Sequence, residues 1–142
     1  MGRRAVLATT LLFGFALLCS APSNATPPVG VSTTALSAQN VDGTDYIVSE
    51  ITIAPGGSTG WHTHRGAVYG IVKAGVLTHY SSDCRQDGVF GVGAPITDPT
   101  GLDHVHIGRN EGMTPVVLEV TYVDPLGVPT SDSAPNPGCE FE

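Results

Sequence analysis

The chain is poor in basic residues. It has six lysines and arginines against thirteen aspartates and glutamates in 142 residues, a formal net charge of −7. Two of the arginines, Arg3 and Arg4, lie at the amino terminus, so residues 26–142 hold four basic residues against all thirteen acidic ones, a formal charge of −9. Nucleic acids and anionic membrane surfaces attract proteins through basic patches. The composition therefore argues against both as partners.

The sequence also lacks the signatures of several enzyme classes. It has no Gly-x-Ser-x-Gly turn for a serine nucleophile, no Gly-x-x-x-x-Gly-Lys loop for phosphate groups and no glycine fingerprint for a dinucleotide. No pair of carboxylates stands out for glycoside hydrolysis. A sustained helical period is missing beyond residue 25, so we expect no helical domain.

An N-terminal apolar segment is typical of a secretory signal peptide. Two arginines precede an almost wholly apolar run over residues 5–18, and Ser23-Asn24-Ala25 fits a small-x-small cleavage site. We assign residues 1–25 to a signal peptide and expect a secreted or otherwise extracytoplasmic protein that is free of the membrane after processing. An uncleaved anchor is the alternative, but the run is short for a membrane-spanning helix. A lipid anchor on Cys19 is disfavoured because a bulky leucine precedes it.

The remaining residues, 26–142, suit one compact domain. They retain two of the three cysteines, Cys84 and Cys139. An exported chain meets oxidising conditions in which these two can pair. The alternative, a reactive thiol or a metal ligand, has no Cys-x-x-Cys and no neighbouring histidine to support it. We predict a disulfide that ties the C-terminal tail, residues 125–142, to the domain.

Short β-strands are the predicted elements of this domain. Residues 45–54 form the clearest strand, with Ile47, Ile51 and Ile53 on one face, and the Pro55-Gly56-Gly57 run is expected to end it. An edge strand is expected at residues 31–37. The other expected strands are residues 67–73 and 76–80 as a hairpin, 89–90, and 104–109 and 115–123 as a last hairpin. Such strands with closely spaced turns are typical of an all-β sandwich or barrel.

Four of the five histidines lie in two His-x-His pairs, His62 with His64 and His104 with His106. A strand points alternate side chains to the same side, so the two members of a pair share a face and can converge on one metal ion. A single pair would more often be ordinary polar surface, but two pairs in a chain so poor in histidine favour a metal site. The fifth, His79, is expected on the surface, with a place in a pocket as the alternative.

The first pair lies in a pattern that resembles the first conserved motif of the cupin superfamily. That motif is a glycine, five residues, His-x-His, three or four residues, glutamate, six residues and glycine. The matching glycines and histidines of this chain are Gly56, His62, His64 and Gly75. The glycines allow tight chain reversals beside the histidine strand. The glutamate position falls on Val68, or on Tyr69 with the longer spacing, and neither is a carboxylate.

The second pair follows a stretch that resembles the second cupin motif. That motif is a glycine, five residues, Pro-x-Gly, two residues, histidine, three residues and asparagine. Counting forward from Pro99-x-Gly101 selects His104, whereas counting back from Asn110 selects His106. We place His106 in the ligand role because the Arg-Asn-Glu-Gly run after it looks like the turn that follows the motif's histidine. His104 is the substitute, and both could contribute as alternate residues of one strand.

The resemblance covers residues 45–124 and implies a fold. The expected architecture is a cupin-type conical β-barrel, also described as a double-stranded β-helix or jelly roll, with six to eight strands in a single domain. Residues 26–44 would precede it as an extended segment and edge strand. The resemblance also implies one divalent metal ion, Fe, Zn, Ni, Cu or Mn, with a homodimer as an open expectation because cupins commonly dimerise through edge strands. The expected metal ligands are His62, His64 and His106, with His104 as the substitute.

Three hypotheses for function follow from the resemblance. Three imidazoles without the glutamate leave coordination positions for water or substrate, which fits a metal-dependent, dioxygenase-like enzyme acting on a small molecule. The alternatives are a non-catalytic module that binds a small ligand or the metal, and a structural cupin with a vacant site. Four other residues have candidate roles beside ordinary ones: Tyr69 and Glu119 in place of the missing acid, Asp103 orienting a histidine, and Trp61 lining the pocket or closing the core.

Overall fold

The computed structural model describes residues 25–142, so the predicted signal peptide lies outside the described residues except for Ala25. The described residues form ten β-strands and no helix. Their bounds are β1 Val29–Val41, β2 Thr44–Ser58, β3 His62–His64, β4 Ala67–Ala74, β5 Leu77–Ser81, β6 Gln86–Phe90, β7 Pro95–Asp98, β8 Gly101–Arg109, β9 Val116–Pro125 and β10 Asp132–Ser133. This part of the chain therefore has no helix that could cross a membrane.

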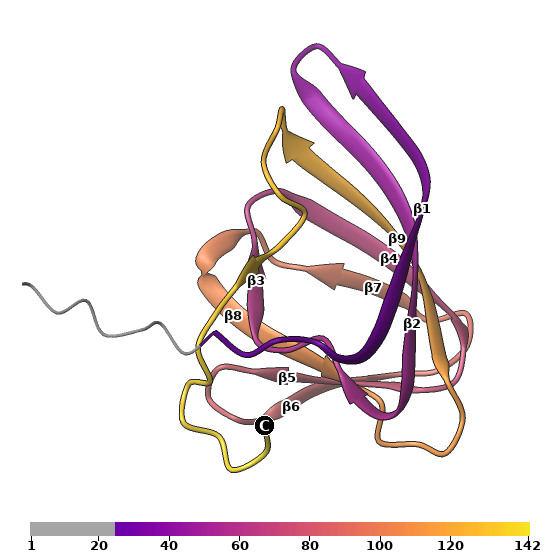
Figure 1. Cartoon of the computed structure of the whole chain (residues 1–142), viewed down its shortest axis with the longest axis vertical. Coiled ribbons are helices and arrows are strands. Elements are labelled where there is room, and N and C mark those ends of the chain that lie inside the picture. Colours follow the sequence, from indigo (N-terminus) through magenta and orange to yellow (C-terminus); the bar gives the residue numbers. More distant parts are fainter. Residues whose placement is uncertain (1–24) are drawn as a thin grey trace, which may run out of the picture.

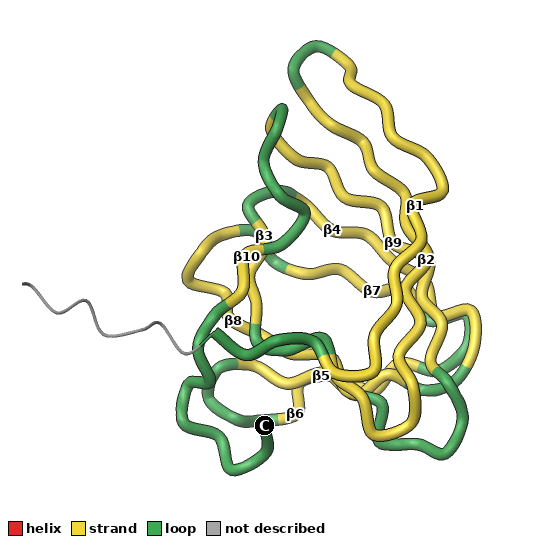
Figure 2. The backbone as a smooth tube through the Cα atoms, viewed as in Figure 1, coloured by secondary structure: helices red, strands yellow, loops and turns green. Residues whose placement is uncertain are grey.

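The strands form two curved layers around one interior (Figure 1). One layer has the order β1-β2-β9-β4-β7 and the other has the order β10-β3-β8-β5-β6, with antiparallel pairing throughout. The layers meet where Ser58 of β2 pairs with Arg109 of β8. The β1–β2 hairpin extends beyond the other strands (Figure 2). The predicted all-β barrel or jelly roll is confirmed, with ten strands instead of the six to eight expected.

The main core fills the space between the layers. In β9 every second residue from Val116 to Asp124 is buried, as the two-residue period of a strand demands. The apolar residues of this face, such as Leu118 and Val120, pack against Val72 of β4 and other buried side chains of β2, β5 and β7. Because β9 lies between β2 and β4, its inward face forms the centre of the interior wall.

Strand β2 continues through the Pro55-Gly56-Gly57 run that was expected to end it. Gly56 has a φ of 74°, a left-handed conformation that suits glycine. Its amide donates to the Asn110 carbonyl and the Asn110 amide donates to the Gly57 carbonyl, each over 2.9 Å. The expected strand end is therefore wrong. The glycines redirect β2 from its pairing with β9 toward β8 in the other layer.

Neither of the two predicted hairpins is present. Strand β4 pairs with β7 and β9, whereas β5 pairs with β6 and β8. Likewise β8 pairs with β2, β3 and β5, and β9 pairs with β2 and β4. The two strands of each expected hairpin thus lie in opposite layers, and the turns that join them are crossings between the layers. At one crossing Gly75 has a φ of 74°, and an added Cβ would lie 2.5 Å from the Pro115 carbonyl oxygen, so only glycine fits.

The C-terminal tail packs against the outside of the β3–β8 layer. The predicted disulfide between Cys84 and Cys139 is present, closing a loop over a separation of 55 residues. Cys139 lies in a second apolar cluster whose centre is Trp61, which has no exposed surface. The ring of Phe141 stacks on that of Trp61 with centroids 6.0 Å apart. The tail thereby covers one face of the strands whose other face points into the barrel.

Candidate metal site

Three histidines converge at one end of the barrel interior. His62 and His64 are alternate residues of β3, and His62 pairs directly with His106 of the neighbouring strand β8. The ring centroids lie 4.4 Å apart for His62 and His106, 4.8 Å for His62 and His64, and 5.1 Å for His64 and His106. One ring nitrogen from each lies within 4.8 Å of the other two. The structure therefore brings together the three residues that the sequence placed in the ligand role.

Backbone carbonyls fix the tautomer of all three rings. The Nδ1 atom of His62 lies 2.9 Å from the Gly60 oxygen, that of His64 lies 2.7 Å from the Thr130 oxygen, and that of His106 lies 2.9 Å from the His104 oxygen. A carbonyl oxygen can only accept, so each Nδ1 carries the proton and donates it. In its neutral form, each ring then has an Nε2 with a free lone pair. This arrangement is typical of metal-bound histidines, whose second nitrogen is held by an outer partner.

Burial keeps two of these rings neutral. It lowers the pKa of His62 to about 3, with further lowering by the charges of His106 and His64. It also lowers the pKa of His106 to about 4, against an opposing effect of Asp98. The Nε2 of His106 is buried and has no hydrogen-bond partner among the described residues. A buried, unpartnered and unprotonated nitrogen aimed at two other imidazoles has the protonation state that a metal ligand requires.

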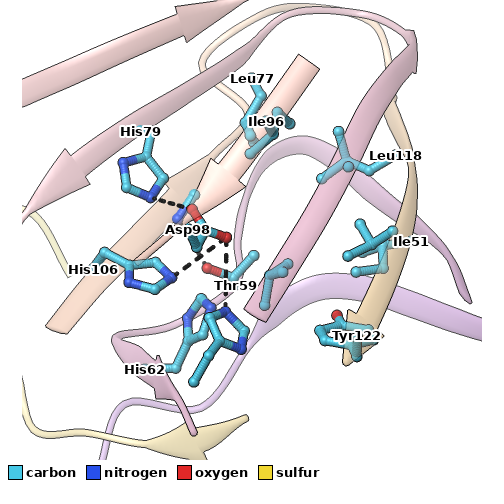
Figure 3. Close-up of a pocket in the computed structure, with 15 residues that line it drawn as sticks. Ile51, Thr59, His62, Leu77, His79, Ile96, Asp98, His106, Leu118 and Tyr122 are labelled. Atoms are coloured by element: carbon cyan, nitrogen blue, oxygen red, sulfur yellow. Dashed lines mark hydrogen bonds and ion pairs between the residues drawn. The ribbon is translucent and has the colours of Figure 1, made fainter. Parts of the chain in front are cut away.

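A carboxylate, Asp98, and a fourth histidine, His79, lie beside the three histidines in the barrel interior. Asp98, at the end of β7, places Oδ2 3.7 Å from Nε2 of His64 and 3.8 Å from Nε2 of His106. Its Oδ1 lies 3.5 Å from Nε2 of His79 on β5. On its other side, His79 donates from Nδ1 to Oδ1 of Asp87 over 2.5 Å. Figure 3 shows His79, His106 and Asp98 pointing toward one another, with His62 below them.

The pKa values of Asp98 and His79 shift in opposite directions. Burial raises the pKa of Asp98, but the ion pair with His79 and the neighbouring histidines His106 and His64 lower it more, so it ends below its ordinary value. Burial lowers the pKa of His79, but Asp98 and Asp87 raise it more, so it ends above its ordinary value. The site therefore contains an ionised carboxylate beside the neutral rings of His62 and His106.

The histidines lie beside a narrow cavity whose far wall is apolar. That wall includes Leu118, Ile51 and Tyr122, opposite the histidines and Asp98 (Figure 3). The cavity has about 50 Å³ of free space, and since a single water needs roughly 10–15 Å³ on this measure, it has room for only a few atoms. A second hollow, with about 160 Å³ of free space, borders His62 and His64 from the side of Thr130. Because both spaces are small, only small molecules can bind next to the three histidines.

The substitute ligand His104 does not join the cluster. Its side chain is exposed, and it contributes its backbone carbonyl to His106 instead. The reason is an irregularity between β3 and β8, where His62 pairs with His106 but His64 pairs with Gly101. Two steps along β3 thus correspond to five along β8, and the extra residues bulge outward. The bulge separates His104 from His106 despite their even spacing.

The candidates for the missing acid lie elsewhere. Tyr69 has 56% of its surface exposed, so its phenol is outside the barrel. Glu119 lies on the outer face of β9, where its carboxylate is 3.5 Å from Nζ of Lys73. Val68, at the motif's glutamate position, is buried and lines the cavity. The carboxylate that does approach the histidines, Asp98, was not considered from the sequence.

Three further expectations are decided by burial. Trp61 closes the second core cluster and does not line the cavity. Asp103 is exposed and orients none of the three histidines in the described part of the chain. Their Nδ1 atoms donate to backbone carbonyls instead. The expectation of a surface position for His79 is wrong, because its side chain is 12% exposed and lines the cavity. Strand β5 lies next to β8, which the predicted hairpin with β4 did not anticipate.

The donor set fits a divalent metal ion. Three unprotonated imidazole nitrogens with a carboxylate oxygen nearby are ligands that suit zinc, iron, nickel, copper or manganese. Protein ligands of one ion have to approach within a few ångströms of each other, and the imidazole nitrogens already do so. The outer partners that fix ligand orientation are also in place.

Comparison with known proteins shows the fold. No sequence family matches the chain and no curated protein is detectably similar to it. A cupin domain from Bordetella pertussis is 23% identical over 70% of this chain and 96% of its own, with a TM-score of 0.56. A protein with a double-stranded β-helix domain from Klebsiella pneumoniae is 22% identical over 80% and 89%, with a TM-score of 0.59. Recombinant oxalate oxidase in complex with glycolate is 25% identical over 74% of this chain, which spans 53% of that protein, with a TM-score of 0.56.

Proposed function

We propose that the chain, which shares the double-stranded β-helix fold of the cupins, is a cupin that binds one divalent metal ion through His62, His64 and His106. The observation that carries the proposal is the set of three Nδ1 atoms that donate to backbone carbonyls and leave three Nε2 lone pairs directed at one another. The ion is Fe, Zn, Ni, Cu or Mn, since imidazole ligands suit all of them.

The second part of the proposal is a small molecule that binds beside the ion. The polar side of the cavity offers a cationic centre once the ion is bound, which favours a ligand with an oxygen donor such as a small carboxylic acid. The opposite wall, with Leu118 and Val120, offers mainly apolar contacts and excludes bulk water. The limited free space of the cavity selects ligands of a few non-hydrogen atoms.

A dioxygenase-like or oxidase activity is the candidate enzymatic function of this site. Support comes from the likeness to oxalate oxidase in complex with glycolate, a two-carbon acid of a size that suits the cavity. A bound ion would supply a centre that polarises a donor oxygen or activates dioxygen. The chain itself would hold the ligand rings in one tautomer, present an ionised Asp98 at the cavity wall and keep water out with its apolar face.

Metal content tests the binding function. Protein comprising residues 26–142 is purified without chelator, and its metals are quantified by mass spectrometry. We expect about one ion per chain, loss of that ion in His62→Ala and in His106→Ala, and full retention in His104→Ala, whose side chain is exposed. A chain that holds no Fe, Zn, Ni, Cu or Mn, even after each is supplied in excess, would instead be a structural cupin.

Oxygen uptake then separates an enzyme from a binding module. The loaded protein is given oxalate, glycolate and other small carboxylic acids, and dissolved oxygen is followed with an electrode. Uptake that disappears in His62→Ala supports the enzyme. The non-catalytic module is supported if the protein keeps its metal and binds the same acids saturably in calorimetry but consumes no oxygen.

An extracytoplasmic location completes the proposal. The disulfide between Cys84 and Cys139 supports it, because such bonds persist in oxidising compartments. Mass spectrometry of the protein recovered from its native cells tests it. We expect a chain that begins at Thr26 and contains the disulfide, whereas an intact N-terminus at Met1 would contradict the signal peptide.

A further inference from the structure

A carboxylate stands beside the position where the cupin motif has its glutamate, but it comes from another strand. Strands β4 and β7 pair so that Val68 lies directly opposite Asp98. Directly opposed residues of an antiparallel pair project from the same face, and both line the cavity. We infer that Asp98 is the fourth, anionic protein ligand of the metal, in place of the missing glutamate, and that His79 positions it. This inference rests on the proposed metal site.

The distances support Asp98 as a ligand. Its Oδ2 lies 3.7 Å from Nε2 of His64 and 3.8 Å from Nε2 of His106, so the same oxygen faces two members of the histidine cluster. Two ligands of one tetrahedral ion with bonds of about 2.1 Å lie about 3.4 Å apart. A small approach of the side chains therefore brings these three atoms to the spacing that a shared ion requires.

The charges around Asp98 also favour a cation. Its side chain is only 14% exposed, and a carboxylate that has lost most of its water needs an opposite charge or strong hydrogen bonds. The described residues that line the cavity include no lysine and no arginine. His79, which lies 3.5 Å from Asp98, is shared with a second carboxylate, that of Asp87. The two carboxylates thus share one imidazole, and a divalent ion beside Asp98 would balance the remaining negative charge.

His79 holds the other oxygen of the carboxylate. Its Nε2 is buried, has no good hydrogen bond and lies 3.5 Å from Oδ1 of Asp98, while its Nδ1 is fixed by Asp87. Oδ1 therefore faces His79 while Oδ2 faces His64 and His106. This gives the carboxylate one orientation, with its free oxygen toward the histidine cluster. The chain of Asp87, His79 and Asp98 resembles the outer shell that orients ligands in metal sites.

Calorimetric titration of the metal-free protein with Zn²⁺, and with Co²⁺ followed by visible absorption, tests both roles. Asp98→Asn keeps the shape and removes the charge, and we expect it to weaken binding roughly 100-fold and to change the Co²⁺ absorption bands. Asp98→Glu retains a carboxylate and should recover part of the affinity. His79→Gln should weaken binding about 10-fold. The matched control is Asp103→Asn, which removes an exposed carboxylate from the same strand as His106 and should bind as wild type does.

The outcomes separate this inference from the metal site itself. If wild type binds, His106→Ala does not, and Asp98→Asn binds like wild type with unchanged bands, then the site stands and Asp98 is no ligand. If wild type binds no better than His106→Ala, the metal site fails and the inference fails with it. If Asp98→Asn loses affinity but His79→Gln matches wild type in affinity and spectrum, the positioning role of His79 is overturned. Thermal melts of the metal-free variants confirm that each is folded.

Discussion

Strands β3 and β8 have one polar face and one apolar face, and the two are stabilised differently. The inner face presents His62, His64 and His106 to a cavity. The Nε2 atom of His106 has no hydrogen-bond partner among the described residues. The outer face carries Ile107 and adjoins Trp61, both with no exposed surface, and is covered by the tail. The comparison teaches that the inner face is specialised for binding, while the outer face holds the same strands in place.

The two faces are nevertheless connected through the tail. Thr130, which precedes β10, accepts the hydrogen bond from Nδ1 of His64. Strand β10 pairs with β3 through Asp132 opposite Thr63 and Ser133 opposite His62. The segment that covers the apolar face thus also sets the tautomer of one ring on the polar face. Changes on each face should therefore have separable effects on stability and on metal affinity.

The largest expected effect is on stability, from the apolar face. Trp61→Ala should lower the free energy of unfolding of the metal-free protein by about 3–5 kcal/mol, because it leaves a cavity where a fully buried indole packs. Urea denaturation followed by circular dichroism measures it. His104→Ala, an exposed position beside the site, should change stability by less than about 0.5 kcal/mol. If the two variants lowered the free energy of unfolding equally, the two faces would not differ in their contribution to stability.

The next effect comes from the disulfide that ties the tail. Replacement of Cys84 and Cys139 together by serine should cost about 2–4 kcal/mol, because the unfolded chain regains the freedom of a 55-residue loop. Denaturation under identical conditions, with the reduced wild type as a second reference, measures it. We also expect weaker Zn²⁺ binding, since a loosened tail frees Nδ1 of His64 from Thr130. Unchanged stability together with unchanged affinity would show that the tail supports neither face.

The sequence predicted the parts of this structure that depend on short-range periodicity. The all-β class, the disulfide and the common face of His62 and His64 follow from residue spacing and cysteine content, and all three are present. Gly56 and Gly75 both have the left-handed conformation that a tight bend requires, but Gly56 lies within β2 and Gly75 lies at a crossing between the layers, so neither closes a hairpin. Local spacing cannot distinguish a hairpin from a crossing, because both need the same tight turn.

The remaining errors concern which strands become neighbours. His104 was kept as a ligand because it lies two residues from His106 and would share its face in a regular strand. Only the irregular pairing of β3 with β8 places its side chain outside the barrel. Asp98 was overlooked because its approach to the histidines depends on the pairing of β7 with β4, about thirty residues away in the sequence. His79 enters the cavity because β5 lies beside β8. No spacing rule within one strand carries this information.

The smallest of the expected stability effects is the pH dependence of the polar face. The folded pKa values of His62 and His106, about 3 and about 4, lie below the unfolded value of 6.5, so the unfolded state binds more protons as pH falls below 6.5. Each ring should cost about 1.2 kcal/mol of stability when the pH falls from 7 to 5.5. The raised pKa of His79 acts in the opposite sense and only above pH 6.5.

Thermal melting of the metal-free protein in chelator at pH 7 and pH 5.5 measures this dependence. His62→Gln and His106→Gln should each flatten the decrease in melting temperature, because glutamine does not titrate. The exposed His104→Gln should leave the decrease unchanged. If all three variants follow the wild-type curve, the two rings are not held neutral by burial.

The most direct test of the account is the nitrogen NMR spectrum of the histidine side chains in ¹⁵N-labelled protein, with and without Zn²⁺. We predict that His62, His64 and His106 carry their proton on Nδ1 in the metal-free protein, and that one equivalent of Zn²⁺ shifts their Nε2 signals together while the exposed His104 is unaffected. Protons on Nε2 of these rings, or Nε2 signals that do not respond to Zn²⁺, would contradict the metal site.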